Sequence, residues 1–335
     1  MSQAVTHRSG VISSELSAAP LPPALKQVYA NRGVDRLDDI TLPLSQLAPP
    51  SALKGAQAAA EMLADAIEFH ASVVIVGDFD ADGATSCALA VSLLKQMGLE
   101  EVTYLVPNRF EFGYGLTPEI VGVAAQYQPD VLVTVDNGIA SIDGVMAAQM
   151  LGMSVIITDH HLPGDTLPEA DIIVNPNQPG CPFPSKALAG VGVMFYVLTA
   201  LRAELRGRGW FESMGIDIPN LADALDLVAL GTVADVVPLD KNNRTLVAAG
   251  LARMRSGRAR PGIEALFEVA GRDISQVSST DLGFVAGPRL NAAGRLDDMS
   301  VGIECLLAES SASARILAKQ LNDFNKERKE IERTM

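Results

Sequence analysis

The chain has 335 residues, of which 48% are hydrophobic and 20% charged, and it carries a formal net charge of −14 at pH 7. This size and composition predict a globular protein with two compact units, or one large unit with extensions. The negative charge argues against a surface that coats nucleic acid, but an enzyme whose acidic site binds metal ions remains compatible with it.

The pattern of apolar residues and cysteines indicates the cellular compartment. We find no apolar run of about 18 residues and no apolar core of a secretory signal, so we expect no membrane span and no secretion. Three scattered cysteines give neither a disulfide framework nor the spacing of a zinc site. We therefore expect a cytoplasmic protein.

Strands and helices alternate after a proline-rich start. Residues 1–54 predict an irregular N-terminal arm. Helices are then expected at 55–70, 84–97, from 117 and at 141–151, and buried apolar strands at 72–79, 102–106, 131–135, 154–157 and 171–174. This alternation predicts a doubly wound, mostly parallel five-stranded α/β sheet.

The second half of the chain has a helical pattern. We expect helices near 186–205, 220–232, 243–255, 262–270 and 280–286, so a catalytic domain over 55–311 would have an α/β part at about 55–180 and a helical part at about 186–311. Residues 312–335 read as one charged helix without a C-terminal cap. We expect this helix to begin a linker to a further domain.

Acidic residues and histidines follow the predicted strands. They are Asp78, Asp80 and Asp82 in GDFDADG, Asp136 in TVDNG, and Asp159, His160 and His161 in TDHH, joined by Asp235 in GTVADVVPL. Ligands of open parallel sheets bind at the carboxyl ends of the strands, so these side chains are expected at one edge.

Each motif also has a simpler interpretation. A single aspartate after a strand usually caps the next helix, and a single histidine is more often a hydrogen-bonded polar residue than a ligand. A calcium loop would need a glutamate where Leu89 stands. The clustering argues against these readings, because burying so much negative charge without cations is very costly. Carboxylates with imidazole favour Mn²⁺ or a similar ion, and two ions about 3.5–4 Å apart would clamp a phosphate group.

DFDADG, VDNG, TDHH and ADVVPL resemble the four ordered motifs of the DHH phosphoesterase superfamily. A narrower resemblance, to the bacterial single-strand-specific 5′→3′ DNA exonucleases of this superfamily, is carried by GDFDADGATS (77–86), PNRFEFGYGL (107–116), NPNQPGCPFPSKALAGVGVMFYV (175–197) and GPRLNAAGRLDD (287–298). It implies a nuclease of DNA repair and recombination that uses two Mn²⁺ or Mg²⁺ ions. It also implies a monomer that degrades single-stranded DNA to 5′-mononucleotides, with a helicase and a single-strand-binding protein as partners.

The resemblance also implies roles for single residues. The metal ligands would be Asp80, Asp82, Asp136, His160 and Asp235, with Asp136 bridging the ions. Asp78 is a further possible ligand, because Val76 stands where other members have a histidine. His161, Asp136 and Asp82 would be catalytic, with His161 facing the phosphate, while Asp159 and Asn137 would support the ligands.

Two segments are candidates for binding DNA. Arg289, Asn291 and Arg295 lie in GPRLNAAGR, which we expect to be a loop that grips a phosphate; the alternative is a turn used for helix packing. Arg109 and Tyr114 lie in NRFEFGYG, which could stack a base or simply pack its own aromatic residues.

Two other functions are compatible with these motifs. One is a related phosphodiesterase acting on short RNA, a cyclic dinucleotide or pyrophosphate, which the NRFEFGYG and GPRLNAAGR segments oppose. The other is a non-catalytic replication scaffold of the same fold, which would not need an intact set of ligands.

Overall fold

The computed structural model describes residues 9–107, 113, 115–296 and 298–334, and it divides the chain into two units, Met1–Leu47 and Ala48–Met335. The first unit contains helices α1 (Ser14–Ala18) and α2 (Pro23–Ala30) and 3₁₀ turns at Leu37–Asp39 and Leu44–Gln46. The predicted N-terminal arm thus contains two short helices, with turns and irregular segments between and after them. The Ser13 hydroxyl accepts a hydrogen bond from the Leu16 amide, and Pro23 begins α2, so local capping is enough to start both helices.

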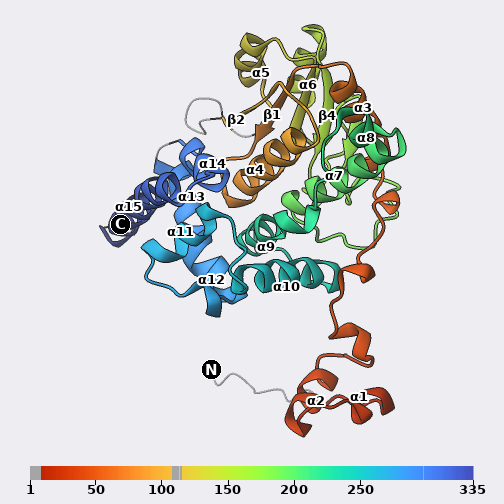
Figure 1. The fold of residues 1–335 in the computed structure, drawn as a ribbon, viewed down its shortest axis with the longest axis vertical. Coiled ribbons are helices and arrows are strands. Elements are labelled where there is room, and N and C mark those ends of the chain that lie inside the picture. The colour runs from red at the N-terminus through yellow and green to blue at the C-terminus, as the bar shows by residue number, and fades with distance from the viewer. Residues whose placement is uncertain (1–8, 108–112, 114, 297, 335) are drawn as a thin grey trace. The chain divides into compact units, whose positions relative to one another are not determined.

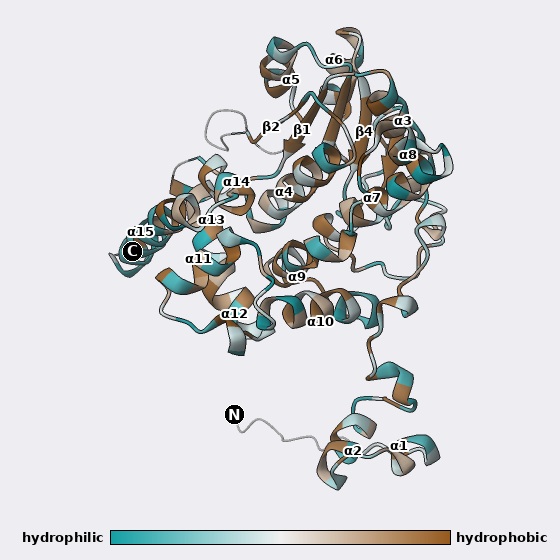
Figure 2. Cartoon of the chain, viewed as in Figure 1, coloured by the Kyte–Doolittle hydropathy of each residue, from teal (hydrophilic) through white to brown (hydrophobic). Residues whose placement is uncertain are grey.

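The second unit is built on a parallel sheet of five strands, as predicted. The strands lie in the order β2-β1-β3-β4-β5, and their bounds are β1 Val73–Gly77, β2 Val102–Leu105, β3 Val131–Val135, β4 Ser154–Thr158 and β5 Ile172–Val174. Every neighbouring pair is parallel. Strands β1 and β3 are buried throughout, and Figure 2 shows the hydrophobic residues gathered on the sheet and on the helices that face it.

Helices cover both faces of this sheet (Figure 1). On one face, α5 (Pro118–Ala124) and α6 (Ile142–Met150) share an apolar core with alternate residues of the strands, such as Val74, Leu132 and Val155. On the other face lie α3 (Ala56–Glu68), α4 (Ala81–Gln96) and α7 (Gly190–Gly207); α3 and α4 both pack on α7, and all three helices contact the strands. The doubly wound α/β fold is confirmed.

The rest of the unit is helical. It comprises α8 (Trp210–Met214), α9 (Leu225–Ala234), α10 (Lys241–Arg255), α11 (Pro261–Val269), α12 (Ser279–Asp281), the π-helical turn Leu282–Ala286, α13 (Gly287–Leu296), α14 (Ser300–Leu307) and α15 (Ser311–Thr334). Helix α9 packs on α4 and α10, while α11, α13 and α14 pack on α15. In the part of the chain that the structure describes, no helix is long and apolar enough to cross a membrane.

Segment GPRLNAAGR is helix α13, so the expectation of a loop was wrong. The helical run continues without a break from α12 through the π-helical turn Leu282–Ala286 into α13, and Pro288 lies just after that turn. Leu290, Ala292 and Ala293 are buried, and this packing outweighs the weak helix propensity of the glycines.

Candidate metal centre

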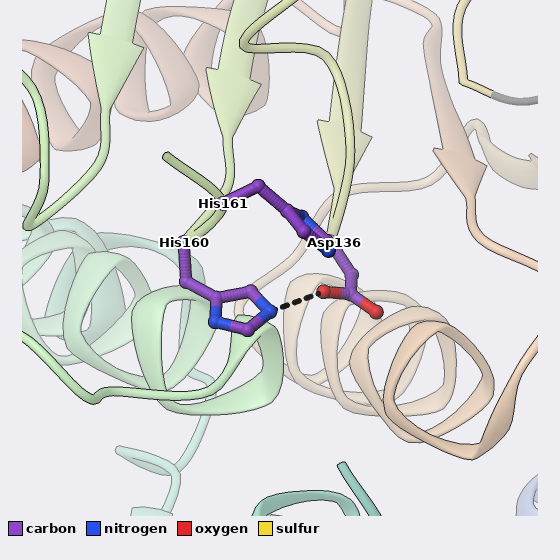
Figure 3. A group of neighbouring side chains, drawn as sticks. All are labelled: Asp136, His160 and His161. Atoms are coloured by element: carbon purple, nitrogen blue, oxygen red, sulfur yellow. Dashed lines mark ion pairs between the residues drawn. The ribbon is translucent and has the colours of Figure 1, made fainter. Parts of the chain in front are cut away.

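The predicted ligands lie at the carboxyl edge of the three central strands. Asp78 follows β1, Asp136 follows β3, and the pair His160 and His161 comes just after β4, and β1, β3 and β4 are neighbours in the sheet. Asp235 reaches the same place from the C-terminal end of α9. Figure 3 shows the His160 ring pointing at the carboxylate of Asp136.

His160 is at the centre of the cluster. Its Nε2 atom lies 3.1 Å from Asp136 Oδ1, 3.5 Å from Asp235 Oδ2 and 4.0 Å from Asp82 Oδ2. Among the described residues, His160 Nε2, Asp136 Oδ1 and Asp235 Oδ2 are buried and have no hydrogen-bond partner. Buried polar atoms rarely remain unpaired, so three of them aimed at one another fit a bound cation.

Three overlapping groups of side chains have potential ligand atoms within 4.8 Å of one another. The groups are Asp136 with His160 and His161, Asp82 with His160 and Asp235, and Asp78 with Asp80 and Asp136. Asp136 belongs to two groups, and its carboxylate could bridge two neighbouring ions; His160 also belongs to two groups, but the Nε2 atom of a neutral imidazole binds only one ion. Oxygen donors with imidazole nitrogen fit Mn²⁺, and the largely carboxylate character also suits Mg²⁺.

The ionisation of these groups supports a cation. Burial, followed by repulsion from neighbouring carboxylates, raises the pKa values of Asp82 and Asp136 well above the usual range. The same causes raise the pKa of Asp78 to about 7 and that of Asp235 to about 6. Burial and the charge of His161 lower the pKa of His160 to about 4. His160 is therefore a neutral ring, able to bind a metal but unable to neutralise the carboxylates as an ion-pair partner.

This electrostatic strain predicts an unusual pH dependence of stability. Carboxyls with raised pKa values stabilise the fold while protonated, and this contribution is lost as pH rises from about 4 through 6 and 7. The lowered pKa of His160 makes stability rise with pH, but this one group opposes four aspartates with raised pKa values. With a chelator present, we expect the melting temperature to fall between about pH 5 and 7.5 in differential scanning fluorimetry, and saturating Mn²⁺ to abolish the fall. A metal-free melting temperature that rises over this range would contradict the prediction.

The N-terminus of α7 also shapes the centre. Asp82 Oδ2 accepts a hydrogen bond from the Gly190 amide at 2.7 Å, and Asp82 Oδ1 accepts one from the Val191 amide at 3.0 Å. A Cβ atom on Gly190 would lie only 2.5 Å from Asp136 Oδ1. The motifs assigned Gly190 no role, although the glycine in ALAGVGV, near the start of the predicted helix, was an available signal.

Asp159 and His161 form a pair beside the ligands. The Nδ1 atom of His161 lies 2.7 Å from Asp159 Oδ1, while Asp159 Oδ2 accepts the Ile139 amide at 2.9 Å. Burial opposes ionisation of Asp159, but its hydrogen bonds with His161 prevail and lower its pKa. The same hydrogen bond raises the pKa of His161 to about 9. The His161 side chain is 44% exposed against 11% for His160, so the two rings have different surroundings.

Three asparagines hold the loops that carry the ligands. Asn137 Nδ2 donates to the carbonyl oxygens of Val76 at 3.0 Å and Val135 at 2.9 Å, which joins the ends of β1 and β3. Asn175 and Asn177 donate to the carbonyl oxygens of His161 and His160. The Val76 side chain is buried in the apolar core, whereas Asp78 lies in one of the three groups.

The candidate DNA-binding residues have mixed outcomes. The Arg289 guanidinium donates to the Val285 carbonyl and to Asn322, which matches the packing alternative. Asn291 Oδ1 accepts a hydrogen bond from the Ala81 amide, so Asn291 contacts the segment that carries Asp80 and Asp82. Arg295 is exposed at the end of α13. Arg109 and Tyr114 lie outside the described residues, and their role stays a prediction.

Comparisons with known proteins show to which family the chain is similar. The model of the DHH family, N-terminal domain, matches residues 72–232. The single-stranded-DNA-specific exonuclease RecJ of Escherichia coli (strain K12) is 55% identical over 317 residues, which cover 95% of this chain and 55% of that protein. The chain thus spans about half the length of the curated relatives it matches.

Two solved structures are also similar. RecJ from Thermus thermophilus in complex with Mn²⁺ gives a TM-score of 0.79 at 32% identity, covering 97% of this chain and 44% of that one. An exonuclease RecJ bound to manganese gives a TM-score of 0.73 at 34% identity, covering 84% and 68%. The chain therefore belongs to the DHH family, in its RecJ branch.

Proposed function

We propose that this chain is the catalytic core of a metal-dependent exonuclease that hydrolyses single-stranded DNA from the 5′ end to 5′-mononucleotides. The observation that carries the proposal is the set of unpaired, buried ligand atoms of Asp136, His160 and Asp235. Further support comes from the relatives named single-stranded-DNA-specific exonuclease and from RecJ structures in complex with Mn²⁺.

The site residues divide the work. Asp80, Asp82, Asp136, His160 and Asp235, with Asp78 in addition, would hold two Mn²⁺ or Mg²⁺ ions. Bound there, these ions lower the pKa of a shared water and neutralise charge on the phosphate. The amides of Gly190 and Val191 fix Asp82, and Asp136, at the end of β3, belongs to two of the three ligand groups and would help to hold both ions.

His161 has a separate task in this proposal. Because its pKa is raised to about 9, it is protonated at neutral pH, and Asp159 holds its Nδ1 atom. Its Nε2–H would then donate to the scissile phosphate or protonate the leaving oxygen.

The two histidines give a paired test. In His160→Ala we expect Mn²⁺ affinity and activity to be lost together. In His161→Ala we expect kcat to fall by about 10²–10⁴-fold, the usual contribution of a general acid, with Mn²⁺ affinity near that of the wild type. Isothermal titration with Mn²⁺, beside steady-state kinetics, separates the two. Equal losses of affinity in both variants would refute the division.

We also propose the cellular setting that the family resemblance implies. The enzyme acts in the cytoplasm as a monomer in DNA repair and recombination, where a helicase and a single-strand-binding protein supply separated strands. All three cysteines are free and buried, which suits a reducing compartment. The net charge of −14 predicts weak, salt-sensitive binding of single strands by this chain alone.

A substrate panel tests the proposed function. Single-stranded DNA labelled at either end, duplex DNA, short RNA, a cyclic dinucleotide and pyrophosphate are incubated with the protein and Mn²⁺. We expect early release of the label from the 5′ end of single-stranded DNA, and none from duplex DNA. Turnover of pyrophosphate, the cyclic dinucleotide or short RNA alone would instead favour the related phosphodiesterases. Mn²⁺ binding without any turnover would favour a scaffold.

A further inference from the structure

Helix α13 lies directly against residues 78–82, which comprise the link after β1 and the first two residues of α4; we call this segment the Asp78–Asp82 loop. The Asn291 side chain accepts a hydrogen bond from the Ala81 amide at 2.7 Å, although the two residues are 210 positions apart. Three residues further along α13, a Cβ on Gly294 would lie 1.9 Å from the carbonyl oxygen of Phe79. The helix therefore contacts the loop at two points without space between them.

The contact completes the cap of α4. The first amides of a helix lack partners within the helix. Asp80 Oδ1 accepts the amides of Asp82 at 2.9 Å and Gly83 at 3.0 Å. The Ala81 amide, which precedes them, is accepted by Asn291, and Ala81 is 1% exposed. Without Asn291 this buried donor would have no partner in the described structure, and the loop would have to open for water to reach it.

Helix α13 is itself held by α15. Arg289, two residues before Asn291, donates from Nη1 to the Val285 carbonyl oxygen at 2.7 Å. Its Nε and Nη2 atoms donate to Asn322 Oδ1 on α15, at 3.2 and 3.0 Å. Arg289 thus joins α13 to α15, and Asn291, two residues further along α13, joins it to the start of α4.

We infer that Asn291 is a positioning residue of the metal centre, which holds the Asp78–Asp82 loop in its ligand-binding shape, with α15 as the support. The effect on metal binding rests on the proposed function, whereas the contact between Asn291 and the loop does not. This role differs from the expected contact with DNA phosphate, because the side-chain oxygen Oδ1 of Asn291 is directed at a backbone amide. Asn291 acts on the reaction through Asp80 and Asp82.

Hydrogen–deuterium exchange on the metal-free full chain tests the geometry. We expect Asn291→Ala to speed exchange of the amides of residues 79–84 by at least tenfold, with the rest of α13 still protected because alanine favours helix. Asn291→Asp keeps an acceptor oxygen and should retain the protection. The matched control is Asn31→Ala, which removes an equivalent contact to the Gly10 amide in the other unit and should leave 79–84 unchanged.

Mn²⁺ titration and kinetics test the consequence. We expect Asn291→Ala to weaken Mn²⁺ binding by about 10–100-fold, as for other residues that orient metal ligands, and excess Mn²⁺ to restore most of kcat. Unchanged exchange with unchanged Mn²⁺ affinity, and a raised KM for DNA alone, would overturn the inference in favour of a substrate contact. The proposed function fails separately, if the wild-type protein itself binds no Mn²⁺.

Discussion

We expect Asp136→Asn to lower kcat/KM for single-stranded DNA by at least about 10³-fold, because weaker metal binding removes several kcal/mol of transition-state stabilisation. Asp136 belongs to two of the three ligand groups, so a neutral amide there weakens both ion positions. Asparagine is the right replacement because Asp136 has a φ of 63°, a left-handed conformation that asparagine tolerates and alanine does not. Steady-state kinetics at saturating Mn²⁺ measure the effect.

The same variant has a second expected property. Removing one of several buried like charges should raise the melting temperature of the metal-free protein above pH 7 while catalysis is lost. The control is Asp143→Asn, an exposed acid in the first turn of α6 that should change neither quantity. Asp136→Asn with more than a tenth of wild-type kcat/KM would refute the role of Asp136.

Gly190→Ala should be nearly as damaging, although glycine carries no functional group. The added Cβ would lie 2.5 Å from Asp136 Oδ1 and 2.6 Å from Asp136 Cβ, and the Cβ of Asp136 cannot move away without its backbone. Either α7 or Asp136 must shift, and the hydrogen bonds from Gly190 and Val191 to Asp82 shift with it. We expect kcat/KM to fall by about 10²-fold or more, as displacements near 1 Å commonly cause.

The matched control lies at the other end of the same helix. Gly207 is exposed, and a Cβ there would meet nothing within 4 Å. Gly207→Ala should keep full activity and gain about 0.4–1 kcal/mol of stability, since alanine restricts the unfolded chain. Equal activity of Gly190→Ala and Gly207→Ala would show that the close approach of α7 to Asp136 is not required for activity.

Sequence patterns predicted the sheet and its acidic edge well, for a physical reason. Buried parallel strands are short apolar runs, and Asp78, Asp136 and Asp159 each follow such a run directly. The carboxyl ends of parallel strands lie at one edge of the sheet, so these residues are predicted at that edge without knowledge of the strand order. The structure brings these residues together with His160, His161 and Asp235, whereas their individual chemical roles stay predictions.

Features that depend on distant packing could not be predicted. The contact of Asn291 with Ala81 joins residues 210 positions apart, and the need for glycine at 190 arises only when α7 meets the end of β3. Segment GPRLNAAGR has the proline and glycines of a turn, yet burial of its leucine and alanines makes it a helix.

Anomalous diffraction from crystals grown with Mn²⁺ shows directly whether the site holds two ions. We expect two anomalous peaks about 3.5–4 Å apart, with Asp136 touching both and the Nε2 atom of His160 touching one. Crystals of Asp136→Asn should lose at least one peak. Crystals of the wild-type protein without any peak among Asp82, Asp136, His160 and Asp235 would contradict a metal centre at this edge of the sheet.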